Sequence, residues 1–441
     1  MTRETATPPR FERPPIPVVV MQHVEDAAHL RHVRSVLVRA PHVRMLQLGR
    51  IDERIAAHLD GIAVAGAYGG GLTLQALERP GVGEVFVATV GAISNRDADR
   101  LDKLLAITEA MPASRAGLLS AFGWVPAPDL QGISRELLEA PHPWHREVGL
   151  ATCAMHGVDP GLALDSAIRA GSGDAGEGEG STALRARALR VAGQCGRRDL
   201  VEACLAALAD AKERCRFAAA SSALLLGDLA QAPDALANMA SDALIAPGLR
   251  LAALRVVLKV ISPQRAQSLL AVFANEPASV RILIQGIGIA GDPHYMPWLI
   301  AQMDDLKLAR LAGEAFSFIT GLDLAYLDLE RKPPENAESG PNDDPADDDV
   351  APDEDESLPW PDPLKIGAWW QANAQRFALG TRYFIGEPPS PSHCLGVLRT
   401  GFQRQRIAAA EYLSLLRPGT PLFSVAAPTW RQHRLLAQMR A

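Results

Sequence analysis

The chain has 441 residues, of which 48% are hydrophobic and only 5% aromatic, and its formal net charge is −7 at pH 7. This composition can bury a large core, and because that core must consist mainly of Ala, Leu and Val, it favours close helix–helix packing over a sheet sandwich. The length fits two or three ordinary domains or one long repeat array.

The sequence carries no signal for export or membrane insertion. No window approaches roughly 18 uncharged apolar residues, and the N-terminal stretch lacks an uninterrupted apolar segment with a cleavage site behind it. The five cysteines form no C-x-x-C pair, and their number is odd. We therefore expect a cytoplasmic protein with reduced thiols, no membrane span and no membrane partner.

We expect a disordered N-terminus over residues 1–20 and a helical region over residues 21–112, with two helices inside residues 22–65. In the first helix, His29 and His32 fall on one face with Glu25 one turn earlier, and helical histidine pairs of this kind can bind zinc. No third ligand of suitable spacing follows, so the favoured interpretation is a solvated face. We expect no metal and no cofactor.

A repeating pattern occupies the middle of the chain. Seven segments open with Arg, or one residue before it, and continue for about ten apolar and small residues; they start at Arg115, Arg146, Arg185, Arg216, Arg250, Val280 and Arg310. The starts lie about thirty residues apart, except where the flexible stretch GSGDAGEGEG, residues 171–180, lengthens one interval. This period predicts a stacked helix–turn–helix unit.

Two further positions support the repeat. Five segments reach a glycine eleven positions after their start, where a left-handed residue can end a helix: Gly157, Gly196, Gly227, Gly291 and Gly321. An acidic residue often stands six positions before the arginine, at Glu109, Glu179, Asp210 and Asp304. The region from Arg115 to Leu324 resembles HEAT repeats of the short kind found in phycobilin lyases. That resemblance implies an α-solenoid over residues 113–330, with an Asp–Arg ladder along the stack.

The stretch GIGIAGD, Gly286 to Asp292, spells the G-x-G-x-x-G of a dinucleotide-binding turn. Such a turn needs a strand before it and a helix after it, with an acid about twenty residues on. Here Pro293 and Pro297 interrupt the required helix, and Glu314 is too distant. We interpret Gly286 and Gly288 as small residues at a helix contact, and Gly291 as a helix cap.

The last quarter of the chain divides by charge. Residues 333–363 carry twelve acids and no Lys or Arg, whereas residues 364–441 have a net charge of +8. We expect residues 331–363 to be a disordered acidic linker, because their composition cannot bury enough apolar surface. Apolar periodicity resumes over residues 364–441, which predicts three or four helices. These helices form a small module or fold back to cap the solenoid. The predicted fold is therefore all-α.

Three strings resemble an uncharacterised family of bacterial HEAT-repeat proteins. They are RIDERIAAHLDGIAVAG at residues 50–66, ARLAGEAFSFITGLDL at residues 309–324 and WWQANAQRFALGTRYFIG at residues 369–386. Members of that family are commonly encoded beside type VI secretion components, effectors and spike proteins. The resemblance spans nearly the whole chain and implies a genetic context. It implies no activity, because the family has none established.

No catalytic motif appears, with neither a G-x-S-x-G elbow nor a Cys–His signature. We therefore expect a non-enzymatic scaffold, adaptor or chaperone that binds a protein partner, a secretion effector or spike component. The candidate contact residues are Trp369, Trp370, Arg376, Arg382, Tyr383, Arg404 and Arg406. A lyase-like enzyme holding a ligand in the solenoid groove is one alternative. Nucleic-acid binding through the basic tail is another, and it is disfavoured because the repeat region is nearly neutral.

Overall fold

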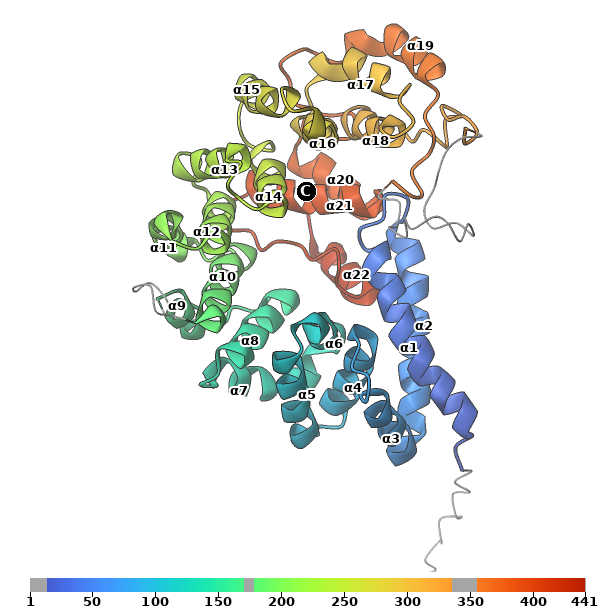
Figure 1. Ribbon diagram of the computed structural model, residues 1–441, viewed down its shortest axis with the longest axis vertical. Helices are drawn as coiled ribbons and strands as arrows, with labels where there is room; N and C mark the ends of the chain where they lie inside the picture. Colours follow the sequence, from blue (N-terminus) through green and yellow to red (C-terminus); the bar gives the residue numbers. More distant parts are fainter. Residues whose placement is uncertain (1–13, 170–177, 335–354, 441) are drawn as a thin grey trace, which may run out of the picture. The chain divides into compact units, whose positions relative to one another are not determined.

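The computed structural model describes residues 14–169, 178–334 and 355–440. Within these ranges the chain forms 22 α-helices, and no β-strand is present beyond two isolated bridges (Figure 1). The predicted all-α fold class is confirmed. No helix in the described ranges is both long and apolar enough to span a bilayer. The predicted disorder of residues 1–20 falls mostly outside the described residues, but helix α1 already begins at Pro17.

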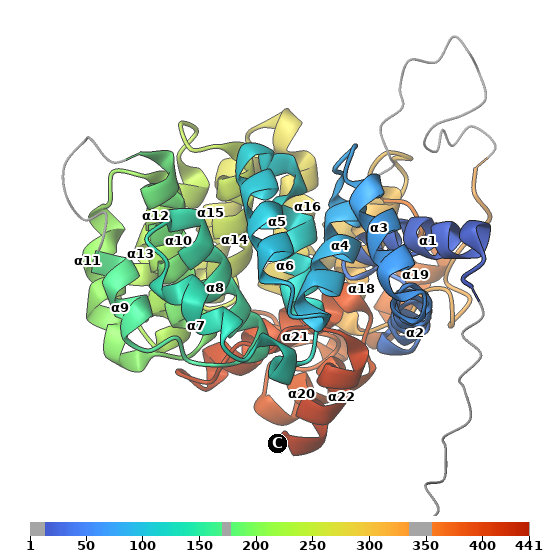
Figure 2. The same cartoon turned by 90° about the horizontal axis from the view of Figure 1, so that it is seen from below.

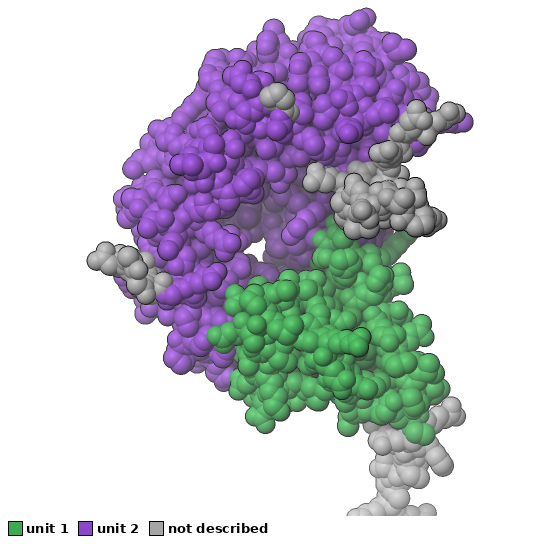
Figure 3. Space-filling view, viewed as in Figure 1, with its two compact units in different colours: residues 1–36, 49–131 green, residues 37–48, 132–441 purple. Residues whose placement is uncertain are grey.

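The chain divides into two compact units (Figure 3). Unit 1 contains residues 1–36 and 49–131, and unit 2 contains residues 37–48 and 132–441. The division differs from the predicted boundary at residue 113, because the helix of the first predicted repeat segment belongs to unit 1. The predicted C-terminal module belongs to unit 2 together with most of the repeats.

Unit 1 is built around two long helices and a group of shorter ones: α1 (Pro17–Leu37), α2 (Met45–Val64), α3 (Gly66–Ala76), α4 (Val82–Ser94), α5 (Ala98–Ala110) and α6 (Arg115–Trp124). An ion pair between Arg34 and the buried carboxylate of Asp52 fastens α1 to α2. Helices α4 and α6 touch so closely that a Cβ on Gly117 would lie 2.2 Å from the carbonyl oxygen of Val82. His29 and His32 lie on the exposed face of α1.

Unit 2 contains six consecutive helix pairs: α7 (Ile133–Glu139) with α8 (Pro143–His156), α9 (Leu162–Arg169) with α10 (Glu179–Gln194), α11 (Val201–Ala206) with α12 (Glu213–Leu226), α13 (Gln231–Ser241) with α14 (Pro247–Val257), α15 (Pro263–Ala274) with α16 (Val280–Ala290), and α17 (Met296–Gln302) with α18 (Ala309–Thr320). We call the even-numbered helices α8 to α18 the inner row, because they lie on the side of the C-terminal helices (Figure 1). Each inner-row helix packs against the next one. These helices are the last six predicted repeat segments.

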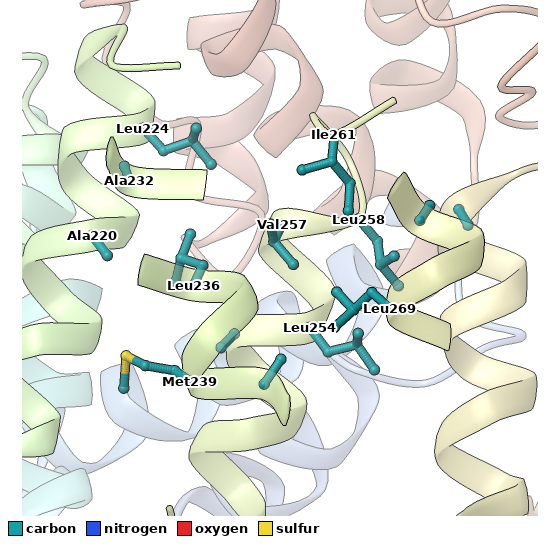
Figure 4. Packing of buried hydrophobic residues seen from close by; sticks show 14 of the residues in the cluster. Ala220, Leu224, Ala232, Leu236, Met239, Leu254, Val257, Leu258, Ile261 and Leu269 are labelled. Atoms are coloured by element: carbon teal, nitrogen blue, oxygen red, sulfur yellow. The ribbon is translucent and has the colours of Figure 1, made fainter. Parts of the chain in front are cut away.

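The core between neighbouring pairs consists of aliphatic side chains, as the low aromatic content predicts. Around α14, Leu254, Val257 and Leu258 meet Leu236 of α13 and Leu269 of α15 (Figure 4). All five are at most 8% exposed. Burial of this kind contributes about 25 cal/mol per Å² of apolar surface, which makes the contact between neighbouring pairs the main stabilising interaction of the row.

The glycines predicted to end the repeat helices do so. Four of them, Gly157, Gly227, Gly291 and Gly321, are left-handed caps at the ends of α8, α12, α16 and α18, and Gly196 has the same conformation one residue after the cap of α10. The interpretation of GIGIAGD is also confirmed. A Cβ on Gly286 would lie 2.6 Å from the side chain of Leu270, and a Cβ on Gly288 would lie 3.0 Å from the Cα of Ala315.

The repeat arginines have a role that the sequence alone does not show. Most of them donate to a backbone carbonyl group at the end of the preceding helix, and the pairs are Arg115 with Thr108, Arg185 with Ile168, Arg216 with Asp210, and Arg250 with Ala240. The last four carbonyl groups of a helix lack intrahelical partners and carry partial negative charge, so a guanidinium group is stabilising there. The predicted ladder has one clear rung, in which the Nε atom of Arg185 donates to Asp210 of the next pair over 2.9 Å.

The ion pair between Arg185 and Asp210 is far less exposed than a similar pair on the outer row. The side chains of Arg185 and Asp210 are 9% and 10% exposed, whereas those of the outer pair Arg265 and Asp234 are 46% and 61% exposed. Replacing Asp210 with Asn leaves a buried guanidinium without its carboxylate, and should lower the free energy of unfolding by about 2–3 kcal/mol. The matched Asp234→Asn variant should cost less than about 1 kcal/mol. Urea denaturation measures both, and equal losses would contradict this role of Asp210.

Candidate functional site

An aromatic cluster covers the last helix pair. Helix α19 (Pro363–Asn373) packs against α17 and brings the half-buried Trp369 onto Phe316 of α18, with ring centroids 6.0 Å apart. The rings of Trp370 and Tyr383 both contact Phe377, in a tilted and an edge-to-face arrangement, with centroids 5.4 and 5.0 Å away. The two tryptophans predicted to meet a partner therefore pack against the end of the row. The sequence predicts that the C-terminal helices either form a small module or cap the solenoid. Helix α19 has the position of a cap.

The described ends of the predicted acidic linker are ordered. Residues 355–362 return to the same helix pair that residues 329–331 leave: the amide of Arg331 donates to Trp360, and the amide of Asp362 donates to Leu329. Arg281 of α16 donates twice to the buried carboxylate of Asp355, over 2.9 and 2.8 Å. Both described ends of the segment are thus anchored to helices of unit 2. Residues 335–354 lie outside the described residues.

After α19 the chain contacts the inner row in two stretches: residues 382–386 run from α14 to α18, and residues 419–431 run from α12 to α8. Its backbone amides donate to carbonyl groups at or just after the ends of inner-row helices: Ile385 to Phe318, Gly386 to Ile319, Tyr383 to Gly291, Gly419 to Leu225, and Leu422 to Gln194. Arg431 continues the series at Met155 of α8, over 3.4 Å. We call residues 381–431 the return segment. It supplies donors to helix ends whose carbonyl groups have no intrahelical partner.

The cap glycines allow the return segment to approach this closely. A Cβ on Gly291 would lie 2.1 Å from the carbonyl oxygen of Tyr383, and one on Gly196 would lie 2.1 Å from that of Gly419. A Cβ on Gly157 would meet nothing within 4 Å. Gly291 and Gly196 therefore lie at a helix end and also make room for the return segment.

Three helices complete the C-terminal part, α20 (Pro391–Thr400), α21 (Gln403–Leu416) and α22 (Thr429–Gln438). They share a small core of their own, which includes Phe384, Leu398 and Tyr412. Figure 2 shows α20 and α21 along one edge of the inner row. These helices are thus a small module with its own core that is also bonded to the row.

Three of the predicted partner-binding residues make their contacts inside the protein. Arg406 is fully buried, with Nε donating to the carbonyl oxygen of Leu398 over 2.7 Å, and burial lowers the pKa of its guanidinium group to about 10. Arg382 donates to the carbonyl oxygens of Lys259, Ile261 and Ala290, at the ends of α14 and α16.

The third such residue is Tyr383, which is only 9% exposed and accepts a hydrogen bond from the amide of Ala378 on its hydroxyl group. Arg404 is half-buried and donates to Glu314 and to the carbonyl oxygen of Arg39. Of the seven predicted residues, Arg376 has the exposed side chain. The basic charge of the C-terminal part thus largely meets the negative ends of helices within unit 2.

Two ion pairs fasten α21 to the inner row. Nη1 of Arg404 donates to Glu314 of α18 over 2.7 Å, and Nζ of Lys259 lies 3.0 Å from the carboxylate of Glu411. Glu314 occupies a position where Leu254 and Ile284 stand in the neighbouring repeats. Its Oε1 atom is buried and has no hydrogen-bond partner among the described residues. Burial raises the pKa of this carboxyl group, against the opposing effect of Arg404.

A second set of polar residues recurs on the inner row, five positions after the start of four consecutive repeat segments. We call Arg190, Ser221, Arg255 and Gln285 the polar stripe; they stand on the inner-row helices α10, α12, α14 and α16. Nη2 of Arg255 donates to Oε1 of Gln285 over 2.9 Å, so the same position of two neighbouring repeats is joined directly. The sequence analysis missed these residues, although their spacing of one repeat was a usable signal.

The two arginines of the stripe combine exposure with desolvation. Both side chains lie in exposed positions, yet protein atoms around them lower the pKa of each guanidinium group. Repulsion by a second arginine acts in the same direction, from Arg187 on Arg190 and from Arg404 on Arg255. Protein atoms therefore surround part of each guanidinium group, and solvent reaches the rest.

The described residues offer little else for chemistry. They include no group of three or more His, Cys, Asp and Glu side chains that could hold a metal ion. The four most buried thiols, Cys153, Cys204, Cys215 and Cys394, all have a raised pKa because burial disfavours the thiolate, which makes them poor nucleophiles. The polar stripe is therefore the candidate site, and its chemistry is that of binding.

Two glycine variants test the return segment. Gly291 and Gly157 end their helices with nearly the same φ, 70° and 69°, so alanine should cost about 1–2 kcal/mol of backbone strain at either position. Only at Gly291 would the new methyl group also displace Tyr383, at a further cost of about 1–3 kcal/mol. Thermal and urea denaturation compare the two variants. Equal destabilisation would show that the return segment is not held against Gly291.

Glu314 provides a test by pH. Because its pKa in the folded protein lies above the ordinary value of 4.5, the unfolded chain releases this proton first as the pH rises. The stabilising contribution of Glu314 is complete below pH 4.5 and is lost as the pH rises through the folded pKa. The wild type should therefore lose free energy of unfolding relative to Glu314→Gln between acidic and neutral pH. Glu202→Gln, at an exposed position on α11, controls for the loss of a surface carboxylate. A difference that grows in the opposite direction would contradict the assignment.

A scan against protein-family models finds no match for this chain, and a search of curated proteins finds none. The comparisons therefore assign no family and no activity. The resemblance to HEAT-repeat proteins beside secretion genes remains an expectation from the sequence.

Proposed function

We propose that the chain is a non-enzymatic protein-binding scaffold, in which a HEAT-like α-solenoid presents the inner row to a partner. The observation that carries this proposal is the direct contact between equivalent positions of neighbouring repeats, as in the hydrogen bond from Arg255 to Gln285, thirty residues apart. Contacts of this kind make one surface continuous over several repeats. Solenoids use such extended surfaces for binding other macromolecules.

The inner row suits a partner better than the C-terminal part does. Arg382 and Arg406 are committed to backbone and side-chain acceptors of their own chain, and the return segment covers the ends of the inner-row helices. The polar stripe, by contrast, leaves two arginines exposed. A rigid row that already carries its cap and its return segment binds with little ordering cost, which favours affinity.

For the partner, we propose a type VI secretion effector or spike component, with the chain acting in the cytoplasm as adaptor or chaperone. The support is the resemblance of residues 50–66, 309–324 and 369–386 to bacterial HEAT-repeat proteins encoded beside such genes. Residues 309–324 contain the last inner-row helix, and residues 369–386 contain the aromatic cover and the start of the return segment.

Affinity purification from the native host tests the proposed function. The tagged full-length chain, extracted at moderate salt, should retain one protein in near-stoichiometric amount, identified by mass spectrometry as an effector or spike component. Arg376→Gln, on the exposed part of the C-terminal module, should retain it equally. A preparation that holds a chromophore or metabolite but no protein would contradict the scaffold and favour a ligand-modifying enzyme.

A further inference from the structure

We propose that the polar stripe is a docking site for an extended acidic peptide segment of a partner protein. This inference rests on the proposed scaffold function and names the chemistry of the partner at that surface. Three independent features carry it: the unpaired charge of the stripe, its unsatisfied polar atoms and its spacing along the row.

The arginines of the stripe lack the carboxylates that other arginines of unit 2 have. Arg187, close to Arg190 on the same helix, pairs with Glu147 over 3.3 Å, and Arg185 pairs with Asp210. Among the described residues no carboxylate lies within ion-pair distance of Arg190, and Arg255 bonds to the neutral amide of Gln285. The carboxylates that act on these two arginines, Glu147, Glu314 and Glu411, are already paired with other cations. A partly desolvated cation without an ion pair of its own is costly, so a carboxylate from a partner is stabilising at both places.

The middle of the stripe carries an unused hydrogen-bonding group. Ser221 stands between Arg190 and Arg255 in the row, on α12, and its Oγ atom is buried without a hydrogen-bond partner among the described residues. Ser221 is half-buried, so a change of its χ1 rotamer is needed to turn this hydroxyl toward an extended peptide, whose free backbone amides and carbonyl groups can bond to it. Carboxylates at two points and backbone between them describe an acidic peptide in an extended conformation.

The spacing sets the length of the peptide. Arg190 and Arg255 stand on α10 and α14, which are separated by α12. Packed helices lie about 8–10 Å apart, so two steps along the row cover about 16–20 Å. An extended chain advances about 3.3 Å per residue, and the two acidic positions should therefore be about five or six residues apart.

The charge of the stripe favours a peptide over a nucleic acid. Nucleic-acid binding requires a concentrated basic surface, and the stripe offers two arginines at separate points. A peptide with carboxylates at two separate points matches these arginines better.

Fluorescence anisotropy with two labelled peptides of about twelve residues tests the proposal. Both contain four Glu in a Gly/Ser background. One has two Glu pairs with centres about six residues apart, and the other has four consecutive Glu. The full-length protein should bind the spaced peptide more tightly. The double variant R190Q/R255Q should lose about tenfold or more in affinity, which is a modest estimate for two charge-assisted contacts. The control R265Q, on the outer row, should stay within about twofold.

Two results would overturn the proposal. One is equal binding of the spaced peptide by wild type and R190Q/R255Q, with both folded by thermal denaturation. The other is a single-stranded oligonucleotide of equal charge that binds more tightly and displaces the peptide, because the stripe would then be a nucleic-acid site. If the partner recovered from the host still binds R190Q/R255Q, the docking site is elsewhere and the scaffold function stands. If no protein is recovered from the host, the scaffold function itself fails.

Discussion

Every helix ends in carbonyl groups that its own backbone cannot satisfy, and unit 2 is organised around that constraint. Outer helices end against the arginine that opens the next inner-row helix, as Arg250 does for Ala240. Inner-row helices end against the return segment, which brings amides and Arg382 to them. The two rows thus use different donors for the same electrostatic need. The repeat arginines supply these donors to the outer helices, and the basic C-terminal part supplies them to the inner row.

This arrangement explains the uneven charge of the chain. A segment with a net charge of +8 suggests an external acidic partner when only its composition is known. In the structure it faces the partial negative charge of successive helix ends, and Arg406 is enclosed in the small core that its own helices form. The charge that remains available lies on the row itself. There, Arg190 and Arg255 are exposed, desolvated and without carboxylates among the described residues.

The local features of the fold were predictable because they leave a periodic mark on the sequence. The spacing of the seven segments located helices α6, α8, α10, α12, α14, α16 and α18, and the glycine eleven positions on located the ends of five of them. The non-local contacts were not predictable. The acceptors of Arg382 and Arg431 are backbone carbonyl groups, which have no residue type, and Arg431 reaches one 276 positions away. The acidic composition of residues 333–363 predicted disorder. It did not predict that the side chains of Asp355 and Trp360 contact arginines of α16 and α18.

The polar stripe was predictable only in part. Its members recur at one position of the repeat, so an alignment of the segments contains them, but Arg, Ser, Arg and Gln share no single chemical type. Their common role follows from the helix packing that places them side by side, and from the exposure that distinguishes Arg190 from the enclosed Arg185.

Hydrogen exchange at the backbone amides of the return segment tests the central claim most directly. If these amides are bonded to the inner-row helix ends, those of Tyr383, Ile385, Gly386, Gly419 and Leu422 should exchange slowly, at rates close to those of the helices they bond. Exchange at the rate of a free peptide, with α12, α16 and α18 still protected, would show that the C-terminal part is an independent module. The basic charge would then be free for a partner after all.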